Sequence, residues 1–468
     1  MAKEKAKPSD AAADVLTIFG ITGDLAKKMT FRALYRLEAR GKLDCRIVGV
    51  AIDDWTIEQL RDHAHEAISS TVPDHDVEVF ARLAARISYV LGDYADPATF
   101  AMVGKEVGGA KRPVFYLEVP PSLFAKVVGG LGDAGLVENA RVVIEKPFGH
   151  DLDSAMALNA ELHEVLDEDQ IMRIDHYLGK EPVMDITYMR FSNSMLEPVW
   201  NREHVSHVQM TLAENFGVDD RGRFYDAVGT LRDVVQNHAL QVLALVAMEP
   251  PTGNHHDSVR DKKLELFKAV HSVDPKHYVR GQYDGYLDVD GVAAGSTTET
   301  FVALELAIDN WRWSGVPFFV RAGKNLPVKQ TEVRVVFKRP PRLGVGPPGH
   351  RPDPNQMVIR IDPTPGALLR FIAKKAGEEA FEPADLEVLF EKNPGEEPEP
   401  YERLLDDALR GRAQLFTRED TVEETWRIVQ PLLDDPGPVH PYEPGTWGPD
   451  KAKDLTRGIT EWSEPWRP

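Results

Sequence analysis

The sequence predicts an α/β domain followed by an α+β domain, and three observations support this prediction. Apolar runs in the first third are continuous and are separated by helical stretches. Apolar runs later in the chain alternate with polar residues instead. The chain has 468 residues, of which 42% are hydrophobic, so it can bury more than one core.

The first domain is predicted to be doubly wound and Rossmann-like, over residues 14–175. Continuous apolar strands that alternate with helices indicate a parallel sheet covered on both faces. The runs that predict its strands are DVLTIFG, CRIVGVAI, RPVFYLEVPP and ARVVIEKPFG. Residues 1–13 are charged and rich in small side chains, so we expect a disordered tail there.

The second domain is predicted over residues 176–468 as a β+α domain for substrate binding and oligomerisation. Alternating strands favour a large, mainly antiparallel sheet with one covered face. The stretches that predict these strands are HVQMTLAEN, TFVALELAID, TEVRVVFKRP and QMVIRIDP. A long helical stretch is expected between them, over residues 226–248.

Composition narrows the class of protein. Cys45 is the single cysteine, so neither an internal disulfide nor a cysteine metal site is expected, and no metal is predicted. The net charge of −20 disfavours binding to nucleic acid or to an anionic membrane. No apolar run is long enough to span a bilayer, and no signal-like segment opens the chain. Because a single cysteine allows no internal disulfide, we expect a cytoplasmic protein.

A glycine-containing turn follows the first strand. Its candidate cofactor-binding residues are Gly20, Thr22, Gly23, Asp24 and Leu25. Glycines allow backbone N–H groups to approach a pyrophosphate at the positive end of the next helix. The spacing differs from the GxGxxG fingerprint, so a purely structural turn is the alternative.

Lys146 closes a later strand in the stretch EKPFG. Parallel strands place their functional loops at their carboxyl ends, which puts Lys146 on the cofactor side. The following X-Pro bond could be cis and fix this turn. The alternative is an ordinary exposed lysine.

The stretch RIDHYLGK, residues 173–180, concentrates charged and proton-handling groups just before a helix. His176, Tyr177 and Lys180 can together hold a phosphate dianion beside the helix N-terminus. If the strand runs through Asp175 and His176, the two side chains point to opposite faces. A solvated connection is the alternative.

His238 lies in a helix whose following residues are mostly apolar. A lone histidine in such a place is more often a core residue than a base. An aspartate that fixed its tautomer would make it a general base, but spacing alone does not identify this aspartate.

Several of these stretches resemble those of the glucose-6-phosphate dehydrogenase family. The matching stretches run in family order from residue 20 to about residue 335: GDLAKK, EKPFG, RIDHYLGKE, ENFG, RDVVQNHALQ and VRAGKNLP. The resemblance implies oxidation of β-D-glucose 6-phosphate at C1 to 6-phosphoglucono-δ-lactone, the first step of the oxidative pentose phosphate pathway. Hydride would pass to NADP or NAD.

The resemblance also implies a role for each matching residue. His238 would be the catalytic base and Asp175 the residue that orients it. The sugar phosphate would be bound by His176, Tyr177, Lys180 and Lys329, and sugar hydroxyls by Glu214, Asp233 and Lys324. Lys146 would bridge substrate and cofactor, and a homodimer or homotetramer is expected.

Two departures from the family concern the adenosine 2′-phosphate of NADP. The position of the family's arginine is Ile52, and that of its helical lysine is Met29. Asp53 and Asp54 follow Ile52 and would repel a 2′-phosphate, whereas a 2′-hydroxyl can donate to a carboxylate. The sequence therefore predicts NAD use, with Asp53 in the cofactor site, unless Arg46, Lys27 or Lys28 compensates.

A milder departure is Asp362, which stands where the family often has glutamine near the substrate. Two other functions are compatible with the same residues. One is a non-catalytic phosphosugar or nucleotide sensor, although the expected base and phosphate-binding residues are all present. The other is a dehydrogenase of another hexose 6-phosphate.

Overall fold

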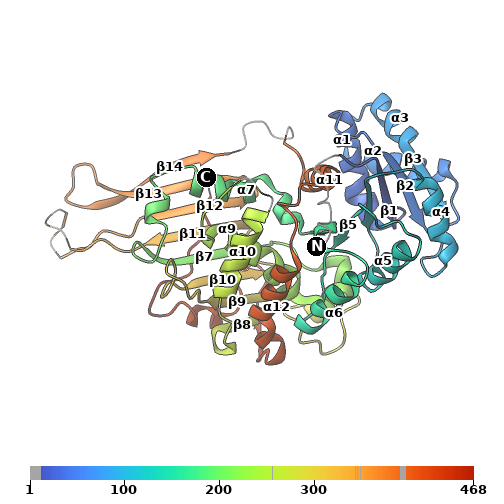
Figure 1. Cartoon of the computed structure of the whole chain (residues 1–468). Helices are drawn as coiled ribbons and strands as arrows, with labels where there is room; N and C mark the ends of the chain where they lie inside the picture. The colour runs from blue at the N-terminus through green and yellow to red at the C-terminus, as the bar shows by residue number, and fades with distance from the viewer. Residues whose placement is uncertain are drawn as a thin grey trace, which may run out of the picture. The chain divides into compact units, whose positions relative to one another are not determined.

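A computed structural model describes residues 12–253, 255, 257–342, 344, 346–347, 349–390 and 397–467. The chain forms two compact units, and Figure 1 shows their elements. The first unit contains the chain up to Lys180, with Thr252–Asp261 and Glu397–Glu423. Glu181–Pro251, Lys262–Glu396 and Glu424–Pro468 form the second unit. Nearly all of the predicted tail, residues 1–13, lies outside the described residues.

The first unit is built on a six-stranded parallel sheet, as the continuous apolar runs predicted. The strands lie in the order β3-β2-β1-β4-β5-β6, so β1 and β4 are the neighbours at which the strand order reverses. The elements are β1 (Val15–Phe19), η1 (Ala26–Thr30), α1 (Phe31–Ala39), β2 (Arg46–Ala51), α2 (Ile57–Thr71), α3 (Val77–Arg86), β3 (Ile87–Leu91), α4 (Pro97–Val107), β4 (Pro113–Leu117), η2 (Pro121–Leu123), α5 (Phe124–Asp133), β5 (Arg141–Glu145), α6 (Leu152–His163), η3 (Glu168–Gln170), β6 (Ile171–Ile174), η4 (His176–Gly179) and α11 (Pro400–Arg410).

Alternate residues of these strands pack on opposite faces of the sheet. Phe19 of β1 packs in one core with Phe100 of α4 and Phe124 of α5. On the other face, Gly49 of β2 approaches Leu60 of α2, and a Cβ at Gly49 would lie 3.2 Å from the Leu60 side chain. Both faces are therefore covered, which explains why β1, β4 and β5 are buried throughout.

Two later segments, Thr252–Asp261 and Glu397–Glu423, also belong to the first unit. The predicted boundary at residue 175 placed both segments in the second domain. The backbone N–H of Ala13 donates to Leu409 O over 2.6 Å. The buried guanidinium of Arg141 donates to Ala408 O and Leu409 O, each over 3.0 Å. These long-range bonds join the first unit to residues near the end of the chain, and no local sequence pattern encodes them.

The second unit has a nine-stranded mixed sheet in the order β14-β13-β12-β11-β7-β10-β9-β8-β15. It is mainly antiparallel, as predicted, but β7 pairs with β10 and β8 with β15 in parallel. Its elements are α7 (Glu181–Phe191), η5 (Glu197–Val199), β7 (Val205–Ala213), η6 (Asp219–Arg221), α8 (Gly222–Thr230), η7 (Leu231–Ala239), α9 (Leu240–Ala247), η8 (Pro275–His277), β8 (Tyr278–Tyr283), η9 (Tyr286–Asp288), β9 (Phe301–Leu306), β10 (Phe318–Gly323), β11 (Gln330–Phe337), β12 (Gln356–Asp362), β13 (Gly366–Lys374), β14 (Phe381–Leu389), β15 (Val439–Tyr442) and η10 (Asp450–Asp454). The boundary between the units falls within α10 (Asp257–Ala269) and within α12 (Glu419–Asp434).

The C-terminal segment bonds to three central strands of this sheet. Gln209 of β7 donates to Glu461 O (2.8 Å), Arg321 of β10 to Ser463 O (2.6 Å), and Arg334 of β11 to Glu464 O (2.9 Å). The polar residues that made these strands look half-exposed in the sequence are therefore buried hydrogen-bonding groups. This is why β7 and β11 are buried along almost their whole length.

Helix α9 is apolar and buried on every side, so its carboxyl end needs polar partners within the protein. Trp200 Nε1 donates to Val246 O and Trp313 Nε1 to Ala247 O, each over 2.8 Å. Arg190 donates to Leu245 O and to Met248 O, each over 2.9 Å. Three fully buried side chains thus satisfy the carbonyl groups that the helix leaves open.

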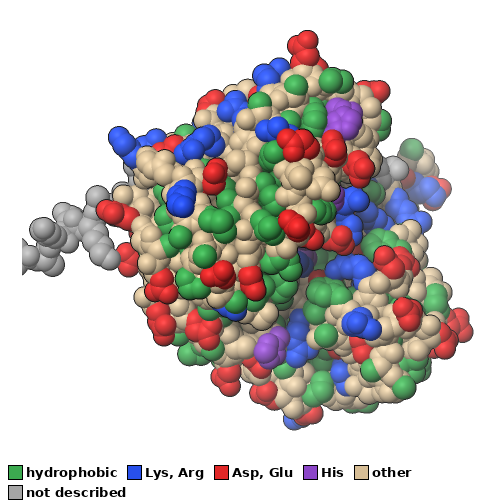
Figure 2. All heavy atoms as spheres, turned by 90° about the vertical axis from the view of Figure 1, so that its right-hand side faces the viewer, with side chains coloured by type: hydrophobic (Ala, Val, Ile, Leu, Met, Phe, Trp, Pro, Cys, Tyr) green, Lys and Arg blue, Asp and Glu red, His purple; other side chains and the backbone are tan. Residues whose placement is uncertain are grey.

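Acidic and basic side chains are interspersed over the face of the molecule in Figure 2. On this face the carboxylates are spread among basic side chains rather than gathered in one acidic patch. Among the described residues, no helix combines the length and apolar character needed to cross a membrane.

We predict that Trp200→Phe and Trp313→Phe each lower the free energy of unfolding by about 2–4 kcal/mol, because each removes a buried hydrogen bond and leaves a cavity. Trp311→Phe is the matched control, since Trp311 is 87% exposed, and should change stability by no more than about 0.5 kcal/mol. Urea unfolding followed by circular dichroism measures both. Equal effects at all three positions would contradict the proposed role of the indole groups.

Candidate functional site

The predicted phosphate turn lies between β1 and η1. Gly20 has φ +86°, and its N–H donates to Val50 O over 2.8 Å. A Cβ at this position would lie 2.3 Å from Glu118 O, so only glycine fits there. The N–H of Gly23 closes the turn onto Gly20 O over 2.8 Å. The turn is thus at the carboxyl ends of β1 and β4, where doubly wound sheets bind their ligands.

The predicted cofactor selector lies beside this turn. Thr22 Oγ1 donates to Asp53 Oδ2 over 2.6 Å, so the loop after β2 is tied to the phosphate turn. The Tyr89 hydroxyl donates to Asp53 O over 2.6 Å and fixes the backbone of the same residue. Ile52 is 67% exposed, which leaves an apolar side chain where the resemblance implies an arginine.

Arg46, Lys27 and Lys28 are the cations that could replace the missing arginine at position 52, and only the two lysines lie near it. Arg46 is the first residue of β2, at the amino end of the strand, and donates to Glu106 O and Val107 O at the end of α4. It therefore lies at the opposite end of the strand from Ile52. Lys28 pairs with Asp24 over 3.1 Å at an exposed position. Lys27 and Lys28 remain as the nearby cations.

Lys146 directly follows β5, and the Lys146–Pro147 bond is cis. Its neighbour Glu145 accepts hydrogen bonds from Tyr116 OH (2.6 Å) and from Tyr401 OH (3.3 Å). The Tyr401 ring stacks on His176 with a centroid distance of 6.4 Å. Tyr401 thereby links the Lys146 turn to the stretch 173–180, although the sequence gave no signal for it.

A second buried carboxyl group lies at the end of β4. Thr30 Oγ1 donates to Glu118 Oε1, while Glu118 Oε2 is buried and has no hydrogen-bond partner. Burial raises the pKa of Glu118 to about 8 and that of Glu145 to about 7. Glu118 directly follows an apolar strand, and this position is the signal that could have identified it.

The stretch 173–180 folds differently from the simple extended strand considered above. β6 ends at Ile174, so strand alternation does not apply to Asp175 and His176. Asp175 instead caps the short helix η4, and its Oδ1 accepts the N–H of Tyr177 over 3.0 Å. Lys180 Nζ lies 4.0 Å from the centroid of the Tyr177 ring. The three predicted phosphate-binding side chains therefore follow one another within a single turn.

In the second unit, two predicted sugar-binding residues meet at the ends of parallel strands. Ala213 of β7 is paired with Gly323 of β10, and the following residues are Glu214 and Lys324. Lys324 Nζ donates to Glu214 Oε2 over 2.6 Å. The register of this parallel pair explains why two residues 110 positions apart form an ion pair.

Asp233 and His238 both lie on η7, a helical segment that is wound more widely than an α-helix. Glu299 fixes its start, because its carboxylate accepts the N–H of Leu231 over 3.0 Å. Gly229 has φ +69°, and a Cβ there would lie 2.5 Å from Glu299 Oε1. His238 is only 4% exposed. The predicted helix over 226–248 is thus interrupted, and the break orients the segment that carries both residues.

The remaining predicted residues are placed simply. Lys329 is exposed, just before β11. Asp362 ends β12 and is followed by a cis bond to Pro363. Asp175 belongs to the first unit and His238 to the second.

Comparison with known proteins identifies the relatives of this chain. The family "Glucose-6-phosphate dehydrogenase, NAD binding domain" matches residues 17–185, and "Glucose-6-phosphate dehydrogenase, C-terminal domain" matches residues 187–463. Glucose-6-phosphate 1-dehydrogenase 1 of Mycobacterium tuberculosis is 55% identical over 457 residues, covering 98% of this chain and 97% of the relative. Glucose-6-phosphate 1-dehydrogenase of Dickeya dadantii is 36% identical over 97% of this chain and 99% of the relative.

Two solved structures have the same fold throughout. The crystal structure of glucose-6-phosphate 1-dehydrogenase from Mycobacterium avium has a TM-score of 0.92 at 55% identity, covering 98% of this chain and 100% of that chain. A glucose-6-phosphate dehydrogenase in complex with its substrate glucose 6-phosphate has a TM-score of 0.88 at 35% identity, covering 97% and 100%.

The dinucleotide-binding sheet and these relatives define an NAD(P)-dependent oxidoreductase. Its cofactor is a nicotinamide dinucleotide. The chain belongs to the glucose-6-phosphate dehydrogenase family.

We predict that Glu118→Gln changes how stability depends on pH. The pKa of Glu118 is raised from 4.5 to about 8, so between these values the folded state holds a proton that the unfolded state releases. Stability from this group is therefore complete below pH 4.5 and lost as the pH rises through 8. The variant should gain about 2–4 kcal/mol relative to wild type between pH 5.5 and 8.5, because wild type loses about 1.4 kcal/mol per pH unit up to pH 8 whereas glutamine stays neutral.

Urea unfolding at both pH values measures this difference. Glu138→Gln is the matched control, because Glu138 is exposed, and should follow the wild-type profile. Part of the pH dependence should remain in Glu118→Gln, since the pKa of Glu145 is also raised. A pH profile that Glu118→Gln leaves unchanged would show that the Glu118 carboxyl is ionised in the folded protein.

Proposed function

We propose that this protein oxidises β-D-glucose 6-phosphate at C1 to 6-phosphoglucono-δ-lactone and transfers the hydride to its nicotinamide cofactor. The observation that carries the proposal is the similarity, over nearly the whole chain, to proteins named glucose-6-phosphate dehydrogenase. One of them was solved in complex with glucose 6-phosphate. The chemistry of the side chains at the strand ends is compatible with it. The phosphate-binding, carboxylate and histidine groups that such a reaction needs are all present.

His238 is the proposed general base. Loss of a hydride from C1 becomes easier as the C1 hydroxyl gives up its proton, so a base near neutrality is required. A histidine that is 4% exposed keeps this proton transfer away from bulk water. Asp175 is the proposed orienting residue, which fixes the imidazole tautomer and stabilises the imidazolium that forms.

The sugar phosphate is proposed to bind His176, Tyr177, Lys180 and Lys329. The first three supply hydrogen-bond donors and a positive charge within one short segment, which suits a phosphate dianion. Lys329 is exposed and its side chain can reach toward a ligand. Replacement of one lysine should therefore weaken substrate binding more than it slows the chemistry.

The sugar hydroxyls are proposed to bind Glu214, Asp233 and Lys324. Glu214 and Lys324 already form an ion pair, so each holds the other in position before the sugar arrives. Carboxylates accept hydrogen bonds from hydroxyl groups, and the ammonium donates to them. Lys146, at the end of β5, is proposed to contact both substrate and cofactor.

The cofactor is proposed to be NAD in preference to NADP. Asp53 is held beside the phosphate turn by Thr22, and a carboxylate there suits a ribose 2′-hydroxyl better than a 2′-phosphate. Ile52 offers no charge to a 2′-phosphate, and Arg46 is engaged at the other end of β2. Lys27 and Lys28 are the groups that could still favour NADP.

The oligomeric state and a second candidate function are also proposed. The chain is proposed to form a homodimer or homotetramer, by resemblance to its family. A sensor function is the second candidate on the same fold, and it requires that the protein bind these ligands without turnover.

We predict that His238→Asn lowers kcat by about 10²–10⁴ with little change in KM for glucose 6-phosphate, because it removes a base that acts in the transition state. Steady-state reduction of NAD and NADP measures this. His207→Asn is the matched control: His207 is equally buried, at 4% exposed, but lies within β7. A His238→Asn variant with near-normal kcat would refute the assignment, and a folded wild type without turnover would favour the sensor.

We predict that Ile52→Arg raises kcat/KM for NADP about tenfold relative to NAD, since a guanidinium can pair with the 2′-phosphate. Ile459→Arg, at a position that is 50% exposed in the second unit, is the control for added charge and should change neither value. The comparison uses initial rates with both cofactors for each protein. A wild type that strongly prefers NADP would refute Ile52, Asp53 and Asp54 as the selector.

A further inference from the structure

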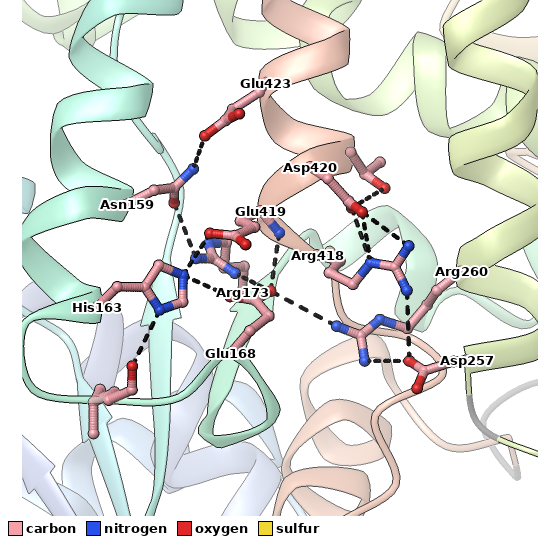
Figure 3. A network of polar contacts seen from close by, with 12 residues as sticks. Asn159, His163, Glu168, Arg173, Asp257, Arg260, Arg418, Glu419, Asp420 and Glu423 are labelled. Atoms are coloured by element: carbon pink, nitrogen blue, oxygen red, sulfur yellow. Dashed lines mark hydrogen bonds and ion pairs between the residues drawn. The ribbon is translucent and has the colours of Figure 1, made fainter.

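A cluster of one histidine and two glutamates lies in the first unit, apart from the residues discussed above. His163 ends α6, Glu168 begins η3, and Glu419 begins α12 (Figure 3). One nitrogen of the histidine and one oxygen of each carboxylate lie within 4.8 Å of one another. These are the ligand types that zinc prefers in proteins.

The hydrogen bond that His163 makes on one side shows which of its ring nitrogens can bind a cation. His163 Nδ1 lies 3.1 Å from Leu166 O, and a carbonyl oxygen can only accept, so Nδ1 carries a proton. In the neutral ring, Nε2 then presents a lone pair. This nitrogen contacts Glu419 Oε2 and lies 3.5 Å from Glu168 Oε2. A lone pair that faces two carboxylates requires a cation among them, and that cation is either a proton or a metal ion.

One carboxylate oxygen of Glu168 is fixed by hydrogen bonds, while the other faces the cluster. Its Oε1 accepts from Arg173 Nη1 over 2.6 Å and from the N–H of Glu419 over 2.9 Å. Its Oε2, which faces His163, is buried and has no hydrogen-bond partner. Arg173 is fully buried, and its Nη2 donates to Asn159 Oδ1 over 2.9 Å. Ligands of a metal ion are typically oriented by such contacts on their far side.

The charges around the cluster also favour an additional cation. The guanidinium groups of Arg173, Arg260 and Arg418 would repel it. They are outnumbered by the carboxylates that bond to them or lie beside them: Glu168, Asp257, Asp261, Glu419, Asp420 and Glu423. The side chains of His163, Glu168 and Glu419 are 27%, 18% and 34% exposed, so an ion can reach them from solvent.

We propose that His163, Glu168 and Glu419 bind a divalent transition-metal cation of the zinc class, with water completing the coordination. Thr417 N donates to Arg173 O over 3.0 Å and places the start of α12 against β6. The cation joins this returning segment to the end of α6. Its role is structural, and it does not depend on the proposed reaction.

The test is zinc sulfate binding to the full chain after treatment with a chelator, measured by calorimetry at pH 7.5. We expect about one zinc per chain and a rise of the melting temperature by about 2 °C or more. Binding should weaken as the pH is lowered, because protons compete with a metal ion for its ligands. His163→Gln and Glu419→Gln should each abolish it, so that one folded variant suffices if the other fails to fold.

His65→Gln is the matched control. His65 Nε2 and His75 Nε2 lie 3.2 Å apart at an exposed position, and this pair is another place where zinc could attach. Zinc binding that persists in His65→Gln and is lost in His163→Gln supports the proposal. Absence of binding to the wild type would overturn it. Loss of binding only in His65→Gln would overturn it as well.

Discussion

The second unit depends on how one buried helix ends. Helix α9 has no polar face, yet its last carbonyl groups must be hydrogen-bonded somewhere. Arg190, Trp200 and Trp313 reach them from three separate places in the sequence and thereby fix the helix against its neighbours. η7, which carries Asp233 and His238, leads directly into α9. The hydrogen bonds at the carboxyl end of α9 therefore also help to hold η7, and with it the proposed base His238, in place within the second unit.

A second constraint is that chemically useful residues follow strands. The turn that is proposed to bind phosphate follows β1, Asp53 follows β2, Glu118 follows β4 and Lys146 follows β5. Because all six strands of that sheet are parallel, these residues lie at one edge. In the second unit, β7 and β10 form a central parallel pair, and the residues that follow them, Glu214 and Lys324, form an ion pair. The geometry of parallel strands thus places the proposed site residues at strand ends in both units.

The sequence predicted those parts of the fold that local patterns determine. The apolar runs identified the parallel strands, and the glycines identified a tight turn after the first strand, because burial and backbone geometry act on neighbouring residues. Tyr401 was not predicted, since its contacts with Glu145 and His176 join residues more than 200 positions apart. Glu299, which fixes the start of η7, was also missed, because its partner Leu231 lies 68 positions earlier in the chain. Sequence alternation also suggested a half-exposed sheet, whereas hydrogen bonds to the C-terminal segment bury its polar side chains.

The first unit is discontinuous in sequence, and this has a consequence for its biosynthesis. Its sheet strands are complete by Ile174, but α11 and the start of α12 belong to the same unit and lie beyond residue 397. A ribosome that adds about 5–20 residues per second must therefore synthesise most of the second unit before the first can close. During this interval the buried face that receives α11 stays open, and the nascent chain needs protection from aggregation there. The strands of the first unit are thus synthesised early, but the unit is complete only after Glu397–Glu423 has been synthesised.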